Sequence, residues 1–212
     1  VVFDCSNGTA GQIVKKLKIK SLKFKVINGK PDGSFPAHGP DPLNRFAIRD
    51  LHSAVLKHRA DLGVIFDADG DRVFFIDNKG RFVDPDIIAR LLVWQIKPKK
   101  AVIDVRAGWL VKKYQVSGIR YQVSKVGHYF IKKLMRKVGA DFGAERSGHY
   151  YFKEFFYADS GILAAIQVIN AVSKLPYKLA DFTDLLPRYY RSGEISARCQ
   201  VSSVRLKELF KK

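Results

Sequence analysis

Short apolar runs alternate along this chain with segments in which apolar residues recur at helical spacing. Residues 1–5 are mostly apolar, as in a short buried strand, and after a Ser-Asn-Gly turn Ile13, Val14 and Leu17 share one helix face. By the same criteria we expect strands at 22–27, 62–66, 73–76, 101–105, 121–124 and 149–152, and helices at 45–59, 85–96, 107–116, 127–138 and 160–172. This alternation indicates an α/β fold with mixed sheets.

The strand and helix alternation occurs twice, so we expect two consecutive small layered α/β domains, each a mixed sheet flanked by helices. A length of 212 residues fits one or two domains. The polar turn at 77–80 ends the first set of elements, which puts the first domain at residues 1–80 and the second at 81–187. Residues 188–212 are interpreted as a linker and the opening strand and helix of a further, C-terminal domain.

Charge is the outlying property of the composition. The formal net charge is +18, although 47% hydrophobic and 27% charged residues are typical of a folded globular protein. A nucleic-acid-binding protein concentrates Lys and Arg beside stacking aromatic residues. Here the basic residues are dispersed, so exposed helix faces and turns account for them and nucleic acid is the disfavoured partner. Such charge is also compatible with steering an anionic substrate.

The sequence gives no sign of a membrane segment or of a cysteine framework. No apolar run approaches the roughly 20 residues that cross a bilayer, and the first residues lack the basic start and cleavage site of a signal peptide. We therefore expect a cytoplasmic protein with no membrane partner. Cys5 and Cys199, the two cysteines, provide neither a disulfide framework nor a metal-ligand spacing.

The most specific segment is the acidic loop Asp-Ala-Asp-Gly-Asp-Arg at residues 67–72, between two expected strands. Asp67, Asp69 and Asp71 alternate, and their crowded charges are costly unless a hard cation such as Mg²⁺ neutralises them. An EF-hand calcium loop does not fit, because its required Gly and Glu positions hold Arg and Asn here. The remaining alternative is a solvated acidic turn.

Two further segments carry polar side chains suited to a sugar or an anion. In Gly-Ala-Glu-Arg-Ser-Gly-His at 143–149, the Glu, Ser and His can hydrogen-bond vicinal hydroxyls, although a hairpin turn has a similar composition. Residues 125–128, Lys-Val-Gly-His, precede an expected helix, and a helix N-terminus binds anions readily. A lone His is more often structural, so neither segment is specific by itself.

Together these segments resemble the α-D-phosphohexomutase superfamily, in particular its phosphomannomutase/phosphoglucomutase branch. The motifs that carry the resemblance are Asp4 to Gly11, Asp32 to Pro42, Asp67 to Arg72, Asp104 to Arg106, Lys125 to His128, Ala144 to His149 and Asp159 to Ile162. They cover essentially the whole chain, with Ala144 where the family usually has Gly. The resemblance implies the second and third domains of that family.

The resemblance also implies a reaction for the parent enzyme. Such enzymes interconvert hexose 1-phosphate and hexose 6-phosphate, here of mannose or glucose. A phosphoserine in the family's first domain donates its phosphoryl group, a hexose 1,6-bisphosphate forms as intermediate or activator, and the serine is then rephosphorylated. One Mg²⁺ would be held by Asp67, Asp69 and Asp71, where it neutralises charge on the transferring group.

Roles for the remaining site residues follow from the same resemblance. It assigns catalysis to Arg72, Arg106 and His128, and substrate binding to Lys125, Glu145, Ser147 and His149. Arginine stays protonated in proteins, so Arg106 would act electrostatically rather than as an acid or base. Substituting Glu145 is then expected to lower catalytic efficiency with little change in melting temperature.

The chain holds neither a Ser-His-Asn-Pro phosphoserine signature nor a Ser/Thr-rich phosphate loop. We therefore expect the N- and C-terminal domains of the same enzyme and a phosphorylated hexose as partners, and we expect these 212 residues alone to fold without mutase activity. Two alternatives stay open: a non-catalytic module that binds metal or sugar phosphate and, less favoured, a basic nucleic-acid-binding protein.

Overall fold

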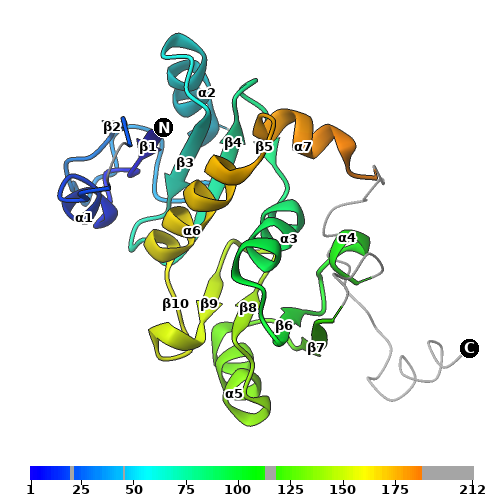
Figure 1. The fold of residues 1–212 in the computed structure, drawn as a ribbon. Helices are drawn as coiled ribbons and strands as arrows, with labels where there is room; N and C mark the ends of the chain where they lie inside the picture. The colour runs from blue at the N-terminus through cyan, green and yellow to red at the C-terminus, as the bar shows by residue number, and fades with distance from the viewer. Residues whose placement is uncertain (20–21, 45, 113–117, 188–212) are drawn as a thin grey trace, which may run out of the picture.

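The structure is a computed structural model that describes residues 1–19, 22–44, 46–112 and 118–187 (Figure 1). The C-terminal segment expected at 188–212, and most of the second half of the helix expected at 107–116, lie outside them. The expectation of an α/β fold with mixed sheets is confirmed.

The first sheet combines three parallel strands with an antiparallel meander. Its strands are β1 (Val2–Asp4), β2 (Lys25–Ile27), β3 (Leu62–Phe66), β4 (Val73–Asp77) and β5 (Phe82–Val83), in the order β2-β1-β3-β4-β5. β1 is parallel to β2 and β3, whereas β4 is antiparallel to β3 and β5 to β4. β3 and β4 are buried at every position, as their continuous apolar sequences predict.

The second sheet repeats this topology. Its strands are β6 (Lys100–Asp104), β7 (Arg120–Ser124), β8 (Phe142–Ala144), β9 (Tyr150–Phe152) and β10 (Ala158–Asp159), in the order β10-β9-β8-β6-β7. β6 is parallel to β7 and β8, and β9 and β10 complete an antiparallel meander. In both sheets the first strand lies between the second and the third. The β3–β4 and β8–β9 loops therefore occupy equivalent positions.

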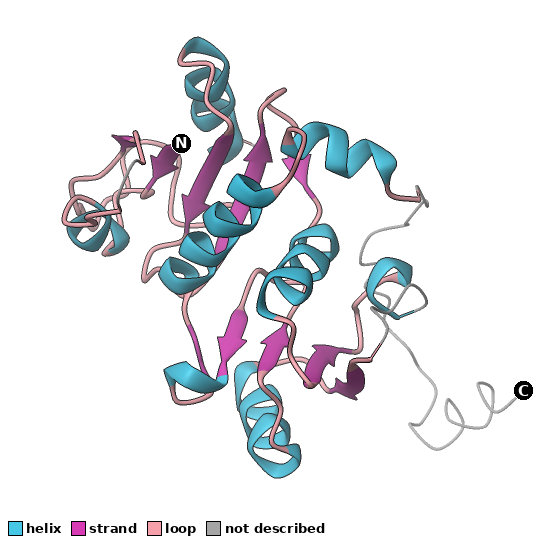
Figure 2. Ribbon diagram, in the orientation of Figure 1, coloured by secondary structure: helices cyan, strands magenta, loops and turns pink. Residues whose placement is uncertain are grey.

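Helices cover both faces of each sheet (Figure 2). They are α1 (Ala10–Val14), α2 (Ala47–Lys57), α3 (Pro85–Ile96), α4 (Trp109–Lys112), α5 (His128–Val138), α6 (Gly161–Lys174) and α7 (Leu179–Leu185), with one short 3₁₀ helix, η1 (Lys153–Phe155). α2 buries Leu51 and Val55 against the first sheet, and α5 buries Ile131 and Met135 against the second. No helix among the described residues has both the length and the apolar character needed to span a membrane.

A shared core joins the two sheets. α6 follows the second sheet in the chain, yet it packs against β3 and β4 of the first sheet and against α3 (Figure 1). One continuous cluster of buried side chains contains Phe75 of β4, Leu92 of α3, Phe142 of β8 and Val168 of α6. The ranges 1–80 and 81–187 stay a prediction, but the apolar cores of the two units are not independent.

Several element ends differ from the sequence pattern. The strand expected at 22–27 is limited to β2, and the helix expected at 107–116 begins only at Trp109. The helix expected at 85–96 matches α3, which Pro85 starts and the Asp84 side chain caps at the amide of Asp86. β5, β10 and η1 were not expected, because two or three residues carry no measurable periodicity.

Candidate active site

The β3–β4 loop and the β8–β9 loop meet where the two sheets approach each other. Arg72 and His149 form an isolated antiparallel bridge. The amide of Val73 donates a hydrogen bond of 3.1 Å to the carbonyl of Gly148. The acidic loop at 67–72 and the Glu-Arg-Ser-Gly-His loop at 145–149 are far apart in the sequence. This pairing brings them together in one site.

Close backbone contacts hold the acidic loop in place. The amide of Gly161, the first residue of α6, donates to the carbonyl of Gly70 at 3.1 Å. A Cβ at Gly161 would lie 2.7 Å from that oxygen, and a Cβ at Gly8 would lie 2.3 Å from the carbonyl oxygen of Ala68. The Thr9 amide also donates to Ala68, at 2.9 Å. These approaches require glycine, which explains two Gly positions that the sequence alone does not.

The three aspartates expected to bind metal lie together. One carboxylate oxygen from each of Asp67, Asp69 and Asp71 lies within 4.8 Å of the others. Asp67 is buried and accepts hydrogen bonds from the amides of Gly70 (3.0 Å) and Arg72 (3.2 Å) and from the Arg72 Nε (2.7 Å). Asp69 is exposed and Asp71 is partly buried. Carboxylate oxygens in such a group are the ligands that Mg²⁺ accepts.

The electrostatics of the site reflect this crowding. Burial raises the pKa of Asp67 to about 6, reinforced by the charge of Asp71 and opposed by Arg72. The contact with His149 lowers the pKa of Asp71 to about 2. Burial by itself would lower the pKa of His149, but Asp71, with the charges of Glu145 and Asp159, raises it above its ordinary value. A cation bound among the carboxylates would relieve their repulsion.

Glu145 is the buried anchor of the β8–β9 loop, with 3% of its surface exposed. Its Oε1 accepts a hydrogen bond from the amide of Gly127 at 2.7 Å. Its Oε2 accepts a hydrogen bond from the hydroxyl of Tyr151. Glu145 therefore joins its own loop to β9 and to the residue that precedes α5. The hydroxyl of Ser147 lies 3.0 Å from Nδ1 of His149.

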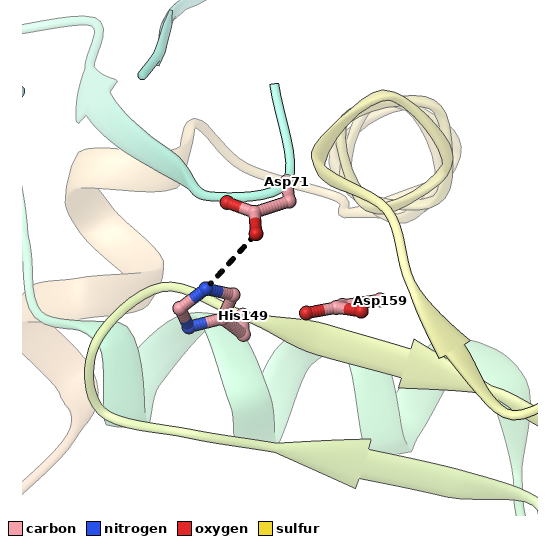
Figure 3. Close-up of side chains that lie close together, drawn as sticks. All are labelled: Asp71, His149 and Asp159. Carbon is pink, nitrogen blue, oxygen red and sulfur yellow. Dashed lines mark ion pairs between the residues drawn. The ribbon is translucent and has the colours of Figure 1, made fainter. Parts of the chain in front are cut away.

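His149 faces two further carboxylates (Figure 3). Its Nε2 lies 3.4 Å from Oδ2 of Asp71. The Asp159 carboxylate points toward the same ring (Figure 3), and its Oδ1 pairs with Nζ of Lys132 at 2.7 Å. The His128 ring is exposed and lies 6.4 Å from the His149 ring, between centroids.

Two arginines lie on the β6 side of this loop. Asp104, at the end of β6, accepts hydrogen bonds from the Arg106 amide (2.7 Å) and from Arg106 Nη2 (3.1 Å). The amide of Arg146 donates to Oδ2 of Asp104 at 3.1 Å, the oxygen that also accepts from Arg106 Nη2. The Arg146 guanidinium pairs with Asp84 and Asp86. Asp104 thereby fixes Arg106 beside the loop that carries Glu145.

A loop from the first sheet reaches the acidic loop as well. Residues 32–42 are anchored by His38, whose Nε2 lies 3.1 Å from Oδ2 of the buried Asp4. Asn28 donates to the same carboxylate at 3.0 Å. Farther along the loop, Asp41 lies 3.7 Å from Nη1 of Arg72. The His38 and Asp4 pair therefore holds the segment that flanks Arg72.

The stability contributed by this pair is expected to depend on pH. The hydrogen bond to Asp4 raises the pKa of His38 above 6.5, against the effect of burial. Because the raised pKa belongs to the folded state, this stabilisation is complete below the ordinary pKa and is lost as pH rises through the raised value. The difference in unfolding free energy between wild type and His38→Gln should therefore shrink as the pH rises above 6.5.

Urea denaturation at several pH values measures this difference. The exposed His58 provides the control, because His58→Gln should show no such loss on raising the pH. A difference for His38→Gln that stays constant across the range would show that His38 is not charged in the pair.

Most of the expected site residues lie close together. The acidic loop with Arg72 contacts the loop that carries Glu145, Ser147 and His149, and His128 and Arg106 flank it. Lys125 is exposed, and its Nζ lies 5.6 Å from the centroid of the Phe130 ring. It lies two residues before Gly127, whose amide donates a hydrogen bond to Glu145. The sequence indicated Asp159 only as the start of a family-like motif, and it did not indicate Tyr151 or Lys132 as site neighbours, because periodicity does not show which side chains meet between elements. The roles of all these residues are proposals.

Family comparisons cover nearly all of the described chain. Residues 1–80 match the family described as phosphoglucomutase/phosphomannomutase, alpha/beta/alpha domain II. Residues 84–189 match the family described as phosphoglucomutase/phosphomannomutase, alpha/beta/alpha domain III.

Curated relatives carry related names. The chain is 38% identical to a phosphomannomutase of Methanocaldococcus jannaschii, over 100% of this chain and 49% of the relative. It is 36% identical to a phosphomannomutase of Escherichia coli (93% of this chain, 46% of the relative) and to a phosphomannomutase/phosphoglucomutase of Pseudomonas syringae pv. tomato (93% and 44%). The chain thus spans about half the length of these relatives.

Solved structures share the fold. A phosphoglucomutase/phosphomannomutase family protein from Burkholderia thailandensis has a TM-score of 0.77 at 26% identity, over 88% of this chain and 42% of that one. The phosphoglucomutase parafusin of Paramecium has a TM-score of 0.69 at 20% identity, over 86% and 35%, which shows likeness of fold alone.

Proposed function

This chain belongs to the phosphoglucomutase/phosphomannomutase family, and we propose that it supplies the metal-binding and sugar-binding part of a phosphohexomutase. The proposed reaction interconverts the 1-phosphate and 6-phosphate of mannose or glucose. The bridge between Arg72 and His149 is the observation that carries the proposal. It brings the acidic loop against the loop with Glu145 and Ser147, as transfer of phosphate to a bound sugar requires.

Asp67, Asp69 and Asp71 would hold one Mg²⁺. The proximity of their carboxylates, and the burial that raises the pKa of Asp67, fit a site that gains by binding a cation. When bound, Mg²⁺ neutralises charge that develops on the transferring phosphoryl group. Arg72, fixed at its Nε by Asp67 (2.7 Å), would provide a second positive charge beside that group.

Glu145 and Ser147 would bind the sugar hydroxyls. Each oxygen of Glu145 already accepts one hydrogen bond, from Gly127 or Tyr151, and retains a lone pair for a ligand hydroxyl. These protein contacts fix the carboxylate before substrate arrives, which lowers the entropy lost on binding. His149 would lie beside the sugar, between the metal loop and Ser147.

The cationic residues around this centre would handle phosphate charge and protons. Arg106 would bind substrate oxygens electrostatically, because arginine does not release its proton in proteins. His128 is exposed at the start of α5 and can exchange a proton with a sugar hydroxyl. Lys125 would contact the non-transferring phosphate as an exposed point charge.

The phosphoryl donor would be a phosphoserine in another domain of the same enzyme, with a hexose 1,6-bisphosphate as intermediate. The expected consequence is that the 212-residue chain alone folds but does not turn over substrate. Phosphoryl transfer depends on a donor, a metal and a phosphate clamp held in one geometry. A coupled assay of hexose 1-phosphate conversion checks this, on chain shown to be folded by circular dichroism.

The same assay on the full-length gene product tests the proposed function. Turnover within the usual range of about 1–1000 per second is expected with mannose or glucose 1-phosphate, and it should be lost with EDTA and restored by Mg²⁺. Folded full-length protein that binds these sugar phosphates without converting them would indicate a binding module instead. Activity of the 212-residue chain by itself would show that the donor lies within these residues.

A further inference from the structure

We propose a second metal site, formed by Asp71, His149 and Asp159 and suited to a borderline divalent ion such as Zn²⁺. One ligand atom from each residue lies within 4.8 Å of the others. Figure 3 shows the carboxylates of Asp71 and Asp159 both turned toward the His149 ring, Asp71 from above and Asp159 from the side. The site shares only Asp71 with the three-aspartate group. It does not depend on the proposed phosphoryl transfer.

The spacing of Asp71 and His149 matches zinc coordination. Zinc binds histidine nitrogen and carboxylate oxygen at about 2.0–2.2 Å, so two ligand atoms of a tetrahedral site lie about 3.3–3.5 Å apart. Nε2 of His149 lies 3.4 Å from Oδ2 of Asp71. This separation is long for an N–H···O hydrogen bond, which has a donor–acceptor distance of about 2.7–3.2 Å. The distance between these two atoms therefore suits two ligands of one zinc ion better than a hydrogen bond.

Asp159 supplies an independent indication of a ligand. Its side chain is only 6% exposed, and within the described part of the chain its Oδ2 is buried without a hydrogen-bond partner. A buried carboxylate oxygen without a partner is costly, and such atoms are usually bonded to protein, water or an ion. Lys132 pairs with the other oxygen, and the contact from His128 to Oδ2 measures 3.9 Å. Oδ2 is therefore available to bind an ion.

The second nitrogen of His149 has the surroundings of a metal-bound imidazole. Histidines that bind zinc usually donate their other N–H to a carboxylate or to another polar oxygen, which fixes the ring and the tautomer. Nδ1 of His149 lies 3.0 Å from the hydroxyl of Ser147 and 3.7 Å from Oε2 of Glu145. With Nδ1 protonated toward these groups, Nε2 presents its lone pair to Asp71 and Asp159.

The ligand set favours Zn²⁺ over Mg²⁺. Imidazole nitrogen suits Zn²⁺ and its neighbours in the first transition series, whereas Mg²⁺ takes oxygen ligands in octahedral geometry. Two carboxylates match the charge of a divalent ion. Since Asp71 belongs to both groups, Zn²⁺ at this site should lower the affinity of the three-aspartate group for Mg²⁺ or Mn²⁺.

Metal binding to the 212-residue chain tests the proposal, with Zn²⁺ measured by competition with a chromophoric chelator and Mn²⁺ by electron paramagnetic resonance. Loss of an outer-shell partner typically lowers metal affinity about 10–100-fold, so Asp159→Asn, which removes a direct ligand, should weaken Zn²⁺ binding by at least that much. It should leave Mn²⁺ binding unchanged. Asp69→Asn should do the reverse.

His149→Gln provides a second loss-of-ligand variant in case Asp159→Asn does not fold, and circular dichroism checks each protein. If both folded variants bind Zn²⁺ like wild type, the proposal is wrong. It is also wrong if Asp69→Asn weakens Zn²⁺ binding as much as Asp159→Asn does, because Zn²⁺ then occupies the three-aspartate group. Failure of Mn²⁺ to bind the wild type would instead count against the Mg²⁺ site of the proposed function.

Discussion

Asp69→Asn in the full-length protein is expected to lower kcat by at least about a hundredfold, with little change in stability. Charge stabilisation by a bound metal is worth several kcal/mol, and each 1.36 kcal/mol is a factor of ten in rate. Asp69 is the most exposed of the three aspartates, whereas Asp67 accepts three hydrogen bonds that shape its loop. Loss of the Asp69 carboxylate therefore removes a metal ligand while the loop keeps its internal contacts.

Steady-state kinetics across a range of Mg²⁺ concentrations measures this effect. Excess Mg²⁺ should recover part of the activity, because the variant lowers metal affinity. Asp50→Asn is the matched control, as Asp50 is an exposed aspartate of α2 that is not part of the acidic loop. Full activity of Asp69→Asn at limiting Mg²⁺ would show that the metal is bound elsewhere.

Glu145→Ala is expected to lose both stability and catalytic efficiency. From the sequence we expected little change in melting temperature. The structure predicts a decrease instead, because Glu145 is buried and accepts hydrogen bonds from the Gly127 amide and the Tyr151 hydroxyl. Each buried polar group left without a partner costs about 1–3 kcal/mol. The melting temperature should therefore fall clearly. Glu154→Ala, at an exposed glutamate of η1, should leave it unchanged.

Glu145→Gln separates the two roles of this residue. The amide oxygen can still accept from Gly127 and the amide nitrogen can donate to Tyr151, so stability should largely return. Hydrogen bonds to a charged group contribute about 1.5–3 kcal/mol, so catalytic efficiency should stay roughly 10–150-fold below wild type. Thermal unfolding measures the structural role of Glu145, and kcat/KM measures its role in catalysis. Wild-type efficiency in folded Glu145→Gln would mean that Glu145 acts only on structure.

The sequence determined most of the local structure and the composition of the site. Continuous apolar runs predicted β3 and β4, and apolar residues at helical spacing predicted a helix at 85–96, because these signals are local along the chain. The acidic loop was recognisable for the same reason, since alternating carboxylates crowd one another in any compact turn. The likeness of several motifs to one family predicted both sheets.

Tertiary structure alone decided how these parts meet. Chain order gives no sign that α6 covers the first sheet, or that Arg72 pairs with His149. It also gives no sign that the Asp159 carboxylate faces His149 or that the Tyr151 hydroxyl bonds Glu145. Periodicity records which face of an element is apolar, but not which partner covers that face. That choice depends on burying the apolar surface of both sheets in one shared core, and the meeting of the two loops follows from it.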